Sequence, residues 1–326
     1  QLEAIVALPE QMFYNTGIGT FIWVVSNRKA AHRRGKIQLI DARERYTPMK
    51  RSLGDKRRYL DQAALDAVTR EHGAFANSKT SRVFDNTDFG YRRITVLRPL
   101  RLRFEITDEA RERFLNTCPE LYDALQAVQD ELGSEPLLDW NQAWDAVQQV
   151  FKTLPDDVEG WAKSAKGTSQ KKIFRDCFTV VDPDAVPVIA KRHKKGDVSV
   201  SSELFPQQTL PALGATEMYA LLGLYADGKA LVEYESDPAL KDAENIPLKE
   251  DIVSYFLREV RPYVADAWID REALDEQDGG IGKIGYEINF NRVFFQYQPP
   301  RPLETIDREL AEVEKRILEL LREVTQ

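Results

Sequence analysis

A short loop near the start of the sequence carries side chains that could hold a planar ligand. Residues 10–17 read Glu-Gln-Met-Phe-Tyr-Asn-Thr-Gly, so two aromatic residues, Phe13 and Tyr14, stand beside two short polar ones, Asn15 and Thr16. An aromatic ring can stack on a nucleobase, and such stacking contributes about 1–3 kcal/mol. This matches the few kcal/mol needed to pull a base out of duplex DNA. The pattern fits a base-stacking site, and it also fits an aromatic residue that fills the bend of a hairpin.

Positive charge gathers in the segment that follows this loop. Residues 27–58 hold twelve Lys or Arg and three Asp or Glu, a net charge of +9, whereas the whole chain carries −8. A basic segment on an acidic protein suits a polyanion such as nucleic acid. The alternative is a solvated loop between strands. The predicted phosphate contacts, chosen by charge density, are Arg28, Lys29, Arg33 and Arg34.

No other motif predicts an active site. Residues 280–285 match the pattern GxGxxG, but they follow an acidic loop and lead into a predicted strand, whereas a dinucleotide site needs a strand before and a helix after. His32, His72 and His193 lie far apart, and we interpret them as surface residues, so no metal site and no catalytic base is predicted. The two cysteines lack disulfide-framework or zinc spacing, which favours a reducing, cytoplasmic setting.

Length and composition exclude several classes of protein. With 326 residues and 43% hydrophobic content, the chain can bury at least one full core. No apolar run approaches the roughly 18 residues that a membrane-spanning helix needs, so no membrane partner is predicted. The chain opens on Gln1 without a signal segment and enters structure at once, so we expect a fragment of something longer.

The elements expected to position the aromatic loop are strands. Apolar runs at 4–8 and 18–25 predict two strands buried on both faces. The nine residues between them are too few for a parallel crossover, so the strands should be antiparallel. A third strand is expected at 37–40. Nothing downstream supplies alternating strands and helices, so the missing strands would precede Gln1 or come from a partner.

From residue 60 onward the sequence predicts mainly helices. Residues 104–155 predict a helical hairpin with a buried aromatic face, and a helix is expected at 249–260. A short strand is expected at 286–297, and 162–235 reads as loops around small elements. The apolar positions of the hairpin are Leu121, Leu125, Val128, Leu132, Trp140, Trp144, Val147 and Phe151.

The end of the chain predicts a helix with a heptad seam. The seam residues are spaced 4, 3, 4, 3 and 4 apart, and each is worth about 1.5–3 kcal/mol when fully buried. The helix could pack on its own domain. We favour a partner helix from another subunit, because the seam follows the stiff run Pro-Pro-Arg-Pro at 299–302. The seam residues are Ile306, Leu310, Val313, Ile317, Leu320 and Val324.

Three blocks of sequence, together about half the chain, resemble the modification subunit of Type I restriction–modification enzymes, which is a DNA methyltransferase. The first contains Leu-Pro-Glu-Gln-Met-Phe-Tyr-Asn-Thr-Gly-Ile and looks like the final strands of the methyltransferase domain. The second is similar to the segment that follows, and the third to the C-terminal region of the family. The blocks occur in the family's order at 8–18 through 40–43, at 81–86 through 94–101, and at 237–248, 266–270, 285–292 and 299–303.

This resemblance implies a fold and an activity. The fold would be an α/β remnant, the C-terminal strands of a Rossmann-like S-adenosylmethionine-dependent methyltransferase sheet, followed by a mainly α-helical region and a long C-terminal helix. The activity would be methyl transfer from S-adenosylmethionine to N6 of a flipped adenine in DNA. Phe13 matches by position the family's base-stacking aromatic, with Tyr14, Asn15 and Thr16 as pocket neighbours. The alternative is a non-catalytic module that binds DNA and protein.

The sequence also departs from the family. It has no Asn-Pro-Pro or Asp-Pro-Pro loop, and the glycine-rich cofactor loop is missing. We therefore expect no catalytic residue in this chain, no S-adenosylmethionine bound to it alone, and no activity without the cofactor-binding half. Gly19 stands where the family usually has proline, so the hairpin could be looser.

The expected organisation has four parts. They are methyltransferase strands at 1–52, a helix and connecting segment at 53–103, a helical variable region at 104–235, and a C-terminal region at 236–326 with the partner helix 303–326. The resemblance implies that this helix packs beside the coiled coil of a specificity subunit. It further implies DNA, a second modification subunit and a restriction subunit as partners in the full complex.

Overall fold

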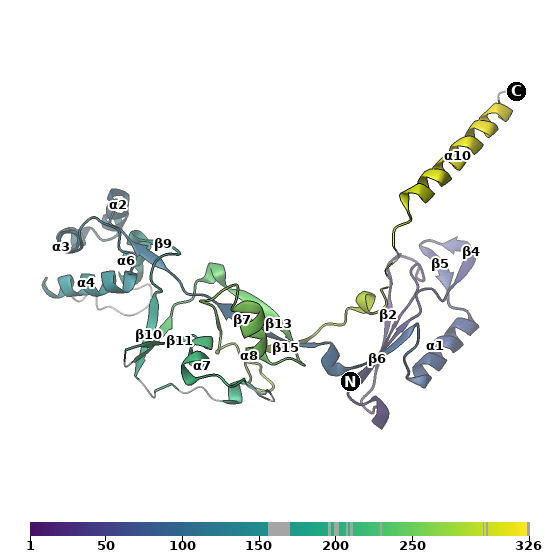
Figure 1. Cartoon of the computed structure of the whole chain (residues 1–326), viewed down its shortest axis with the longest axis horizontal. Coiled ribbons are helices and arrows are strands. Elements are labelled where there is room, and N and C mark those ends of the chain that lie inside the picture. Colours follow the sequence, from purple (N-terminus) through teal and green to yellow (C-terminus); the bar gives the residue numbers. More distant parts are fainter. Residues whose placement is uncertain are drawn as a thin grey trace. The chain divides into compact units, whose positions relative to one another are not determined.

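The chain folds as two compact units with mixed sheets and several helices. One unit is Gln1–Asn86 with Ile288–Gln326, and the other is Thr87–Glu287. They are called unit 1 and unit 2 below, and Figure 1 labels their elements. The structure is a computed structural model, and it describes residues 1–155, 170–194, 197–198, 202–206, 208, 211–228, 230–295, 297 and 299–324.

Unit 1 is built on a four-stranded sheet of order β2-β1-β3-β6. Strand β1 pairs antiparallel with β2 and parallel with β3, and β3 pairs antiparallel with β6. The predicted antiparallel pair is therefore confirmed. Val68 of helix α1 packs on the sheet core. The bounds are β1 Leu2–Ala7, β2 Phe21–Val25, β3 Lys36–Asp41, β6 Ser81–Asp85 and α1 Gln62–Ala74.

Strand β2 is not buried on both faces, so this part of the sequence prediction is wrong. β1 is buried, with Ala4 to Ala7 at most 4% exposed, whereas Trp23 and Val25 are 64% and 66% exposed. The physical reason is position, because β2 is the edge of the sheet and pairs only with β1 among the described residues. Its apolar side chains therefore face solvent on both sides.

Unit 1 also contains a hairpin and two later helices. Strands β4 (Thr47–Leu53) and β5 (Lys56–Tyr59) pair antiparallel. The chain leaves the unit after Asn86 and returns at Ile288, where α9 (Phe290–Val293) is followed by α10 (Leu303–Val324). The predicted terminal helix is thus present. The strand predicted at 286–297 is wrong, because β15 ends at Tyr286 and a helical turn follows.

The described residues of unit 2 include two hydrophobic cores. One lies among helices that bury Phe104, Trp140 and Phe174, and the other lies under a sheet centred on β7, where Ile94 and Phe256 are buried. Its helices are α2 Asp108–Thr117, α3 Tyr122–Leu132, α4 Trp140–Lys152, α6 Gln170–Phe178, α7 Ala215–Leu221 and α8 Ile252–Tyr255, which continues as a π-helix over Phe256–Val260.

Three sheets complete unit 2. They are β13-β7-β14 with β15 also on β7, β10-β12-β11, and β8-β9. Their bounds are β7 Gly90–Leu97, β8 Leu102–Phe104, β9 Thr179–Val181, β10 Ile189–Lys194, β11 Leu224–Asp227, β12 Ala230–Tyr234, β13 Asp242–Pro247, β14 Trp268–Ile269 and β15 Lys283–Tyr286.

The helical hairpin predicted at 104–155 is confirmed as three helices with a buried aromatic face. The prediction of a mainly α-helical region is wrong, because strands β6 to β15 lie between residues 81 and 286. Strand β7 shows why the pattern was missed. Its buried positions include Arg92, which forms an ion pair with Asp278, so the strand lacks a clean apolar alternation.

Two of the predicted phosphate contacts are part of the interior of unit 1. Arg33 is buried, and it donates a hydrogen bond to Glu3 (3.1 Å) and another to the His72 carbonyl near the end of α1. Its guanidinium also lies 4.4 Å from the Phe75 ring centroid. Lys29 is buried, and its amine donates to the Lys36 carbonyl (2.7 Å). Lys29 and Arg33 therefore serve the fold, which corrects their prediction as phosphate contacts.

We predict that Arg33→Ala destabilises the protein by about 3 kcal/mol, because it removes a buried guanidinium and leaves the largely buried Glu3 carboxylate with only the His72 ring beside it. The measurement is urea unfolding followed by circular dichroism. The matched control is Arg34→Ala, which removes an exposed arginine at the next position and should change the free energy of unfolding by less than about 0.5 kcal/mol. Equal effects of the two substitutions would contradict the structural role of Arg33.

Candidate functional site

The carboxyl ends of β1 and β3 define one edge of the sheet in unit 1. Because these strands are parallel, the segments that follow them lie at the same edge. Ligands of open α/β sheets bind outside the carboxyl ends of the strands. The aromatic loop follows β1, and Arg43 follows β3. This edge is therefore the candidate site.

The aromatic loop presents its rings to solvent. Phe13 and Thr16 form an antiparallel bridge that closes the loop, and the Thr16 hydroxyl accepts a hydrogen bond from the Ile18 amide (3.3 Å). Phe13 is 46% exposed and Tyr14 is 58% exposed, and Asn15 is exposed as well. The structure thus brings Phe13, Tyr14, Asn15 and Thr16 together with two rings accessible for stacking.

The β4–β5 hairpin holds the aromatic loop through its backbone. The Asp55 amide donates to the Tyr14 carbonyl (3.0 Å), and the amides of Arg57 and Arg58 donate to the Gln11 carbonyl (2.9 and 3.2 Å). Gly54 permits this approach, because its φ is +61° and a Cβ there would lie 2.8 Å from the Tyr14 carbonyl oxygen. The position of the loop therefore depends on the hairpin.

Arg43 is fixed at the same edge by two contacts far apart in sequence. Its guanidinium donates to both oxygens of Asp41 (2.8 Å each) and to the Asn291 side-chain oxygen (3.1 Å). Partial burial disfavours the charged form of Asp41, but the hydrogen bonds from Arg43 outweigh it and lower the pKa of this carboxyl. Phe290 packs edge-on against Phe21 (5.3 Å between centroids), so α9 belongs to the edge.

Two hollows lie at this edge. The larger has a volume of about 750 Å³ and mixes four cations with three carboxylates and an aromatic wall. The smaller, of about 560 Å³, is lined by Glu10 of the loop, by Phe21 of β2 and by Phe294. The charged side chains of the larger hollow are Glu10, Asp41, Arg43, Glu44, Arg58, Lys79 and Arg82. Cations beside exposed aromatic rings are the groups with which proteins bind nucleic-acid strands.

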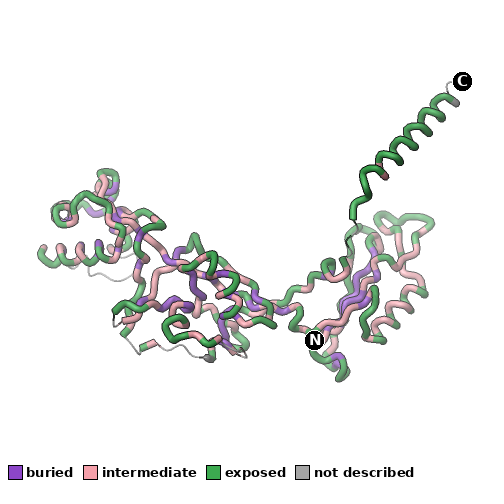
Figure 2. The backbone as a smooth tube through the Cα atoms, viewed as in Figure 1, coloured by how far each residue is buried: buried purple, intermediate pink, exposed green. Residues whose placement is uncertain are grey.

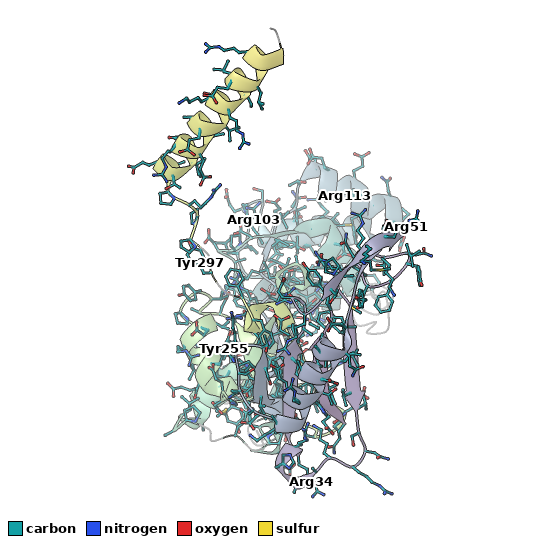
Figure 3. The ribbon with its side chains drawn as sticks, turned by 90° about the vertical axis from the view of Figure 1, so that its right-hand side faces the viewer. Arg34, Arg51, Arg103, Arg113, Tyr255 and Tyr297 are labelled. Carbon is teal, nitrogen blue, oxygen red and sulfur yellow. The ribbon has the colours of Figure 1, made fainter. Side chains whose placement is uncertain are left out.

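The basic segment predicted as one footprint is divided between two ends of unit 1. Figure 3 shows Arg34 and Arg51 well apart, at opposite ends of the unit. Arg28 and Arg34 are exposed, but they lie beyond the amino ends of β1 and β3, away from the aromatic loop. The cations beside the loop belong to the β4–β5 hairpin. From the sequence, these cations counted only toward the net charge of residues 27–58 and were not predicted as phosphate contacts.

The seam of α10 is largely exposed. Leu310, Val313, Ile317 and Leu320 are each at least 50% exposed, and Ile306 is half-buried. Figure 2 shows exposed residues along this helix. The side chain of Val324 lies outside the described residues. The described side chains of the seam therefore do not form a hydrophobic core with other parts of this chain.

His32 is exposed, as predicted, whereas His72 and His193 are half-buried. His72 lies beside Arg33 and Glu3, and burial together with the charge of Arg33 lowers its pKa. In unit 2, the Glu233 carboxylate pairs with His193 (2.6 Å) and Arg271 beside a hollow of about 360 Å³. Because Glu233, His193 and Arg271 are paired with one another, fewer charged side chains are left to bind a ligand in this hollow than at the edge of unit 1.

Among the described residues, no group of three or more His, Cys, Asp or Glu side chains is placed to hold a metal ion, and no helix is both long and apolar enough to cross a membrane. The GxGxxG run leads into β15, as predicted. Gly282 has φ +81°, and a Cβ there would lie 2.9 Å from the Arg93 carbonyl oxygen. The run therefore serves strand packing and does not fit S-adenosylmethionine.

A family model matches the first part of the chain. Residues 1–85 match the family model described as N-6 DNA Methylase. The predicted relation to N6 DNA methyltransferases is thus confirmed for the segment that carries the sheet, the aromatic loop and the β4–β5 hairpin. No curated protein matches the chain.

Among solved structures, the chain is similar to the methyltransferase subunit of the type I restriction-modification system from Streptococcus thermophilus. The two are 19% identical, with a TM-score of 0.22, over 26% of this chain and 16% of the other. The present chain therefore aligns with less than a fifth of that subunit's length.

We predict that Gly54→Ala loosens the aromatic loop more than Gly35→Ala does. Both positions have positive φ, +61° and +72°, so both substitutions should cost about 1 kcal/mol in backbone strain. Only the Gly54 Cβ would also meet the Tyr14 carbonyl, because nothing lies within 4 Å at Gly35. Hydrogen exchange of the Asp55 amide should become faster in Gly54→Ala alone, and equal exchange in the two variants would count against this contact.

Proposed function

We propose that this chain is part of the modification subunit of a Type I restriction–modification system, a DNA methyltransferase that acts on N6 of adenine. The observation that carries the proposal is the family match of residues 1–85, because this segment contains the aromatic loop, Arg43 and the β4–β5 hairpin of the candidate site. The three sequence blocks resembling the Type I modification subunit support the finer assignment. The activity and partners of the complete enzyme follow from this proposal.

The aromatic loop would receive the adenine that is turned out of the duplex. Phe13 is exposed at the carboxyl edge of the sheet, where its ring can lie flat against a base. Tyr14, Asn15 and Thr16 would border the same pocket, since they belong to the same closed loop. Of the four predicted phosphate contacts, the exposed pair Arg28 and Arg34 stays a prediction of DNA contact.

The cofactor of the complete enzyme would be S-adenosylmethionine, which supplies the methyl group. The GxGxxG run of this chain does not fit it, so we propose that it is held by a part of the enzyme outside residues 1–326, and that this chain alone is inactive. The residues of this chain would bind and orient the base, and no proton transfer is assigned to them.

The open edge of β2 agrees with a sheet that continues. Phe21, Trp23 and Val25 expose apolar surface on one face of β2, and Ile22 exposes it on the other, in a strand that has one unpaired edge among the described residues. We propose that a further strand of the methyltransferase sheet pairs with β2. The four strands of unit 1 would then be the C-terminal strands of a Rossmann-like sheet.

The seam of α10 would bind the specificity subunit. Its exposed apolar side chains repeat with the heptad spacing of a coiled coil, and they would be covered by a partner helix of the same kind. A second modification subunit, a restriction subunit and DNA would complete the assembly, in the cytoplasm.

We predict that Phe13→Ala in the complete enzyme lowers the rate of adenine methylation by roughly 5- to 150-fold, the equivalent of losing about 1–3 kcal/mol of stacking. DNA affinity should stay close to wild type, because phosphate contacts supply most of the binding. The measurements are transfer of a labelled methyl group and DNA binding at one salt concentration.

The control for this experiment is Tyr122→Ala, which removes an exposed ring from α3 of unit 2. It should leave methylation unchanged. Wild-type turnover in Phe13→Ala would remove Phe13 from the pocket. An enzyme that binds DNA but never methylates adenine would favour the alternative, a non-catalytic module.

We predict that Leu310→Asp with Ile317→Asp abolishes binding to the specificity subunit while the chain stays folded. The two substitutions place charges in the middle of the seam, whose side chains are exposed in this chain. Co-purification and circular dichroism are the measurements. The control is Arg308→Asp with Lys315→Asp, which adds two acidic residues to the same helix outside the seam. Unfolding of the seam variant would show that the helix packs within its own chain.

A further inference from the structure

We propose that the β4–β5 hairpin is the main DNA-backbone contact of unit 1 and grips the phosphates beside the base that stacks on Phe13. The inference rests on the proposed function, and it assigns DNA-backbone binding to a surface whose residues were not predicted individually from the sequence. The hairpin region 47–59 carries five Lys or Arg and one Asp, a net charge of +4 over thirteen residues. Its cations are Lys50, Arg51, Lys56, Arg57 and Arg58.

These cations are available for a ligand. Other basic residues of the same unit are paired, since Lys36 binds Asp85, Arg43 binds Asp41 and Arg45 binds Glu71. Among the described residues, no carboxylate forms an ion pair with any of the five hairpin cations. Unpaired positive charge gathered on one small element is the electrostatic footprint of a phosphate-binding surface.

The five cations of the hairpin form two groups, those exposed to solvent and those stacked on a tyrosine ring. Lys50, Arg51 and Arg57 are exposed. Lys56 lies over the Tyr14 ring (5.2 Å to the centroid), and Arg58 lies over the Tyr46 ring (4.0 Å). The stacked pair stiffens the element and fixes it against the aromatic loop, while the exposed three can reach phosphate oxygens.

An irregularity in β4 turns two of the exposed cations outward. Pro48 pairs with Arg58 and Leu53 pairs with Lys56, so residues 49–52 face a single residue of β5. Such bulges bend a strand and re-aim its side chains. Lys50 and Arg51 lie in this bulge, which separates them from the regular ladder.

The same hairpin sets the position of the stacking ring. Its amides bind the carbonyls of Gln11 and Tyr14 on either side of Phe13. A DNA strand held by the hairpin would therefore be held at a fixed place relative to Phe13. Arg28 and Arg34 lie between the end of β2 and the start of β3, at the other end of the sheet, and no hydrogen bond among the described residues links them to the loop.

The test compares two triple variants of the complete enzyme in binding to a fluorescein-labelled DNA duplex over a series of salt concentrations. The hairpin variant is Lys50→Gln with Arg51→Gln and Arg57→Gln. The matched control, Arg70→Gln with Arg308→Gln and Lys315→Gln, removes the same charge from exposed positions of the same unit that are not predicted to contact DNA or the partner helix. The slope of log affinity against log salt should become shallower, in the hairpin variant only, by about 0.9 for each DNA phosphate that is no longer neutralised.

Each outcome decides the inference. A shallower slope and weaker binding in the hairpin variant, with the control at wild type, supports it, provided that circular dichroism shows both variants folded. A wild-type slope in the hairpin variant, or equal losses in both variants, overturns the inference and leaves the proposed function standing as long as the enzyme still binds DNA and methylates adenine. A wild-type enzyme that neither binds DNA nor methylates it overturns the proposed function itself.

Discussion

The parallel pairing of β1 with β3 is the constraint on which the candidate site depends. The register places Ala7 beside Asp41, so the aromatic loop after β1 and the Asp41–Arg43 pair after β3 start from the same edge of the sheet. An antiparallel arrangement would send these segments to opposite ends. The hairpin and α9 then bind to this edge through the loop backbone and through Arg43. Local sequence supplies the aromatic and basic residues, and strand direction brings them together.

Much of the architecture could be predicted from periodicity. The helices between 104 and 155 and the terminal helix follow from apolar spacing, since each buries or presents one regular face, and the antiparallel pairing of β1 with β2 follows from the short connection between them. The strands of unit 2 could not be predicted in this way. In β7 a buried position is filled by Arg92, whose charge is matched by Asp278 from 186 residues further along the chain. A tertiary ion pair leaves no local pattern.

The candidate site, too, could be predicted only in part from the sequence. The exposed loop around Phe13 could be predicted from residue types, and the family match includes it. Charge density could not separate Arg33 from Arg34, because burial of one depends on Glu3, His72 and Phe75 elsewhere in the fold. The hydrogen bonds between the hairpin and the aromatic loop are made by backbone groups, which every sequence carries. In the sequence, only Gly54 indicates this contact, because it adopts a backbone conformation that other residues rarely adopt.

The edge strand β2 has a consequence for the behaviour of this chain in concentrated solution. An unpaired strand that displays Phe21, Ile22, Trp23 and Val25 is a template for addition of a strand from a neighbouring molecule. Glycine and proline are absent from it, and so are the lysines that guard many natural edges. Intermolecular sheet extension, and the aggregation that follows from it, is therefore favoured at this strand wherever nothing covers it.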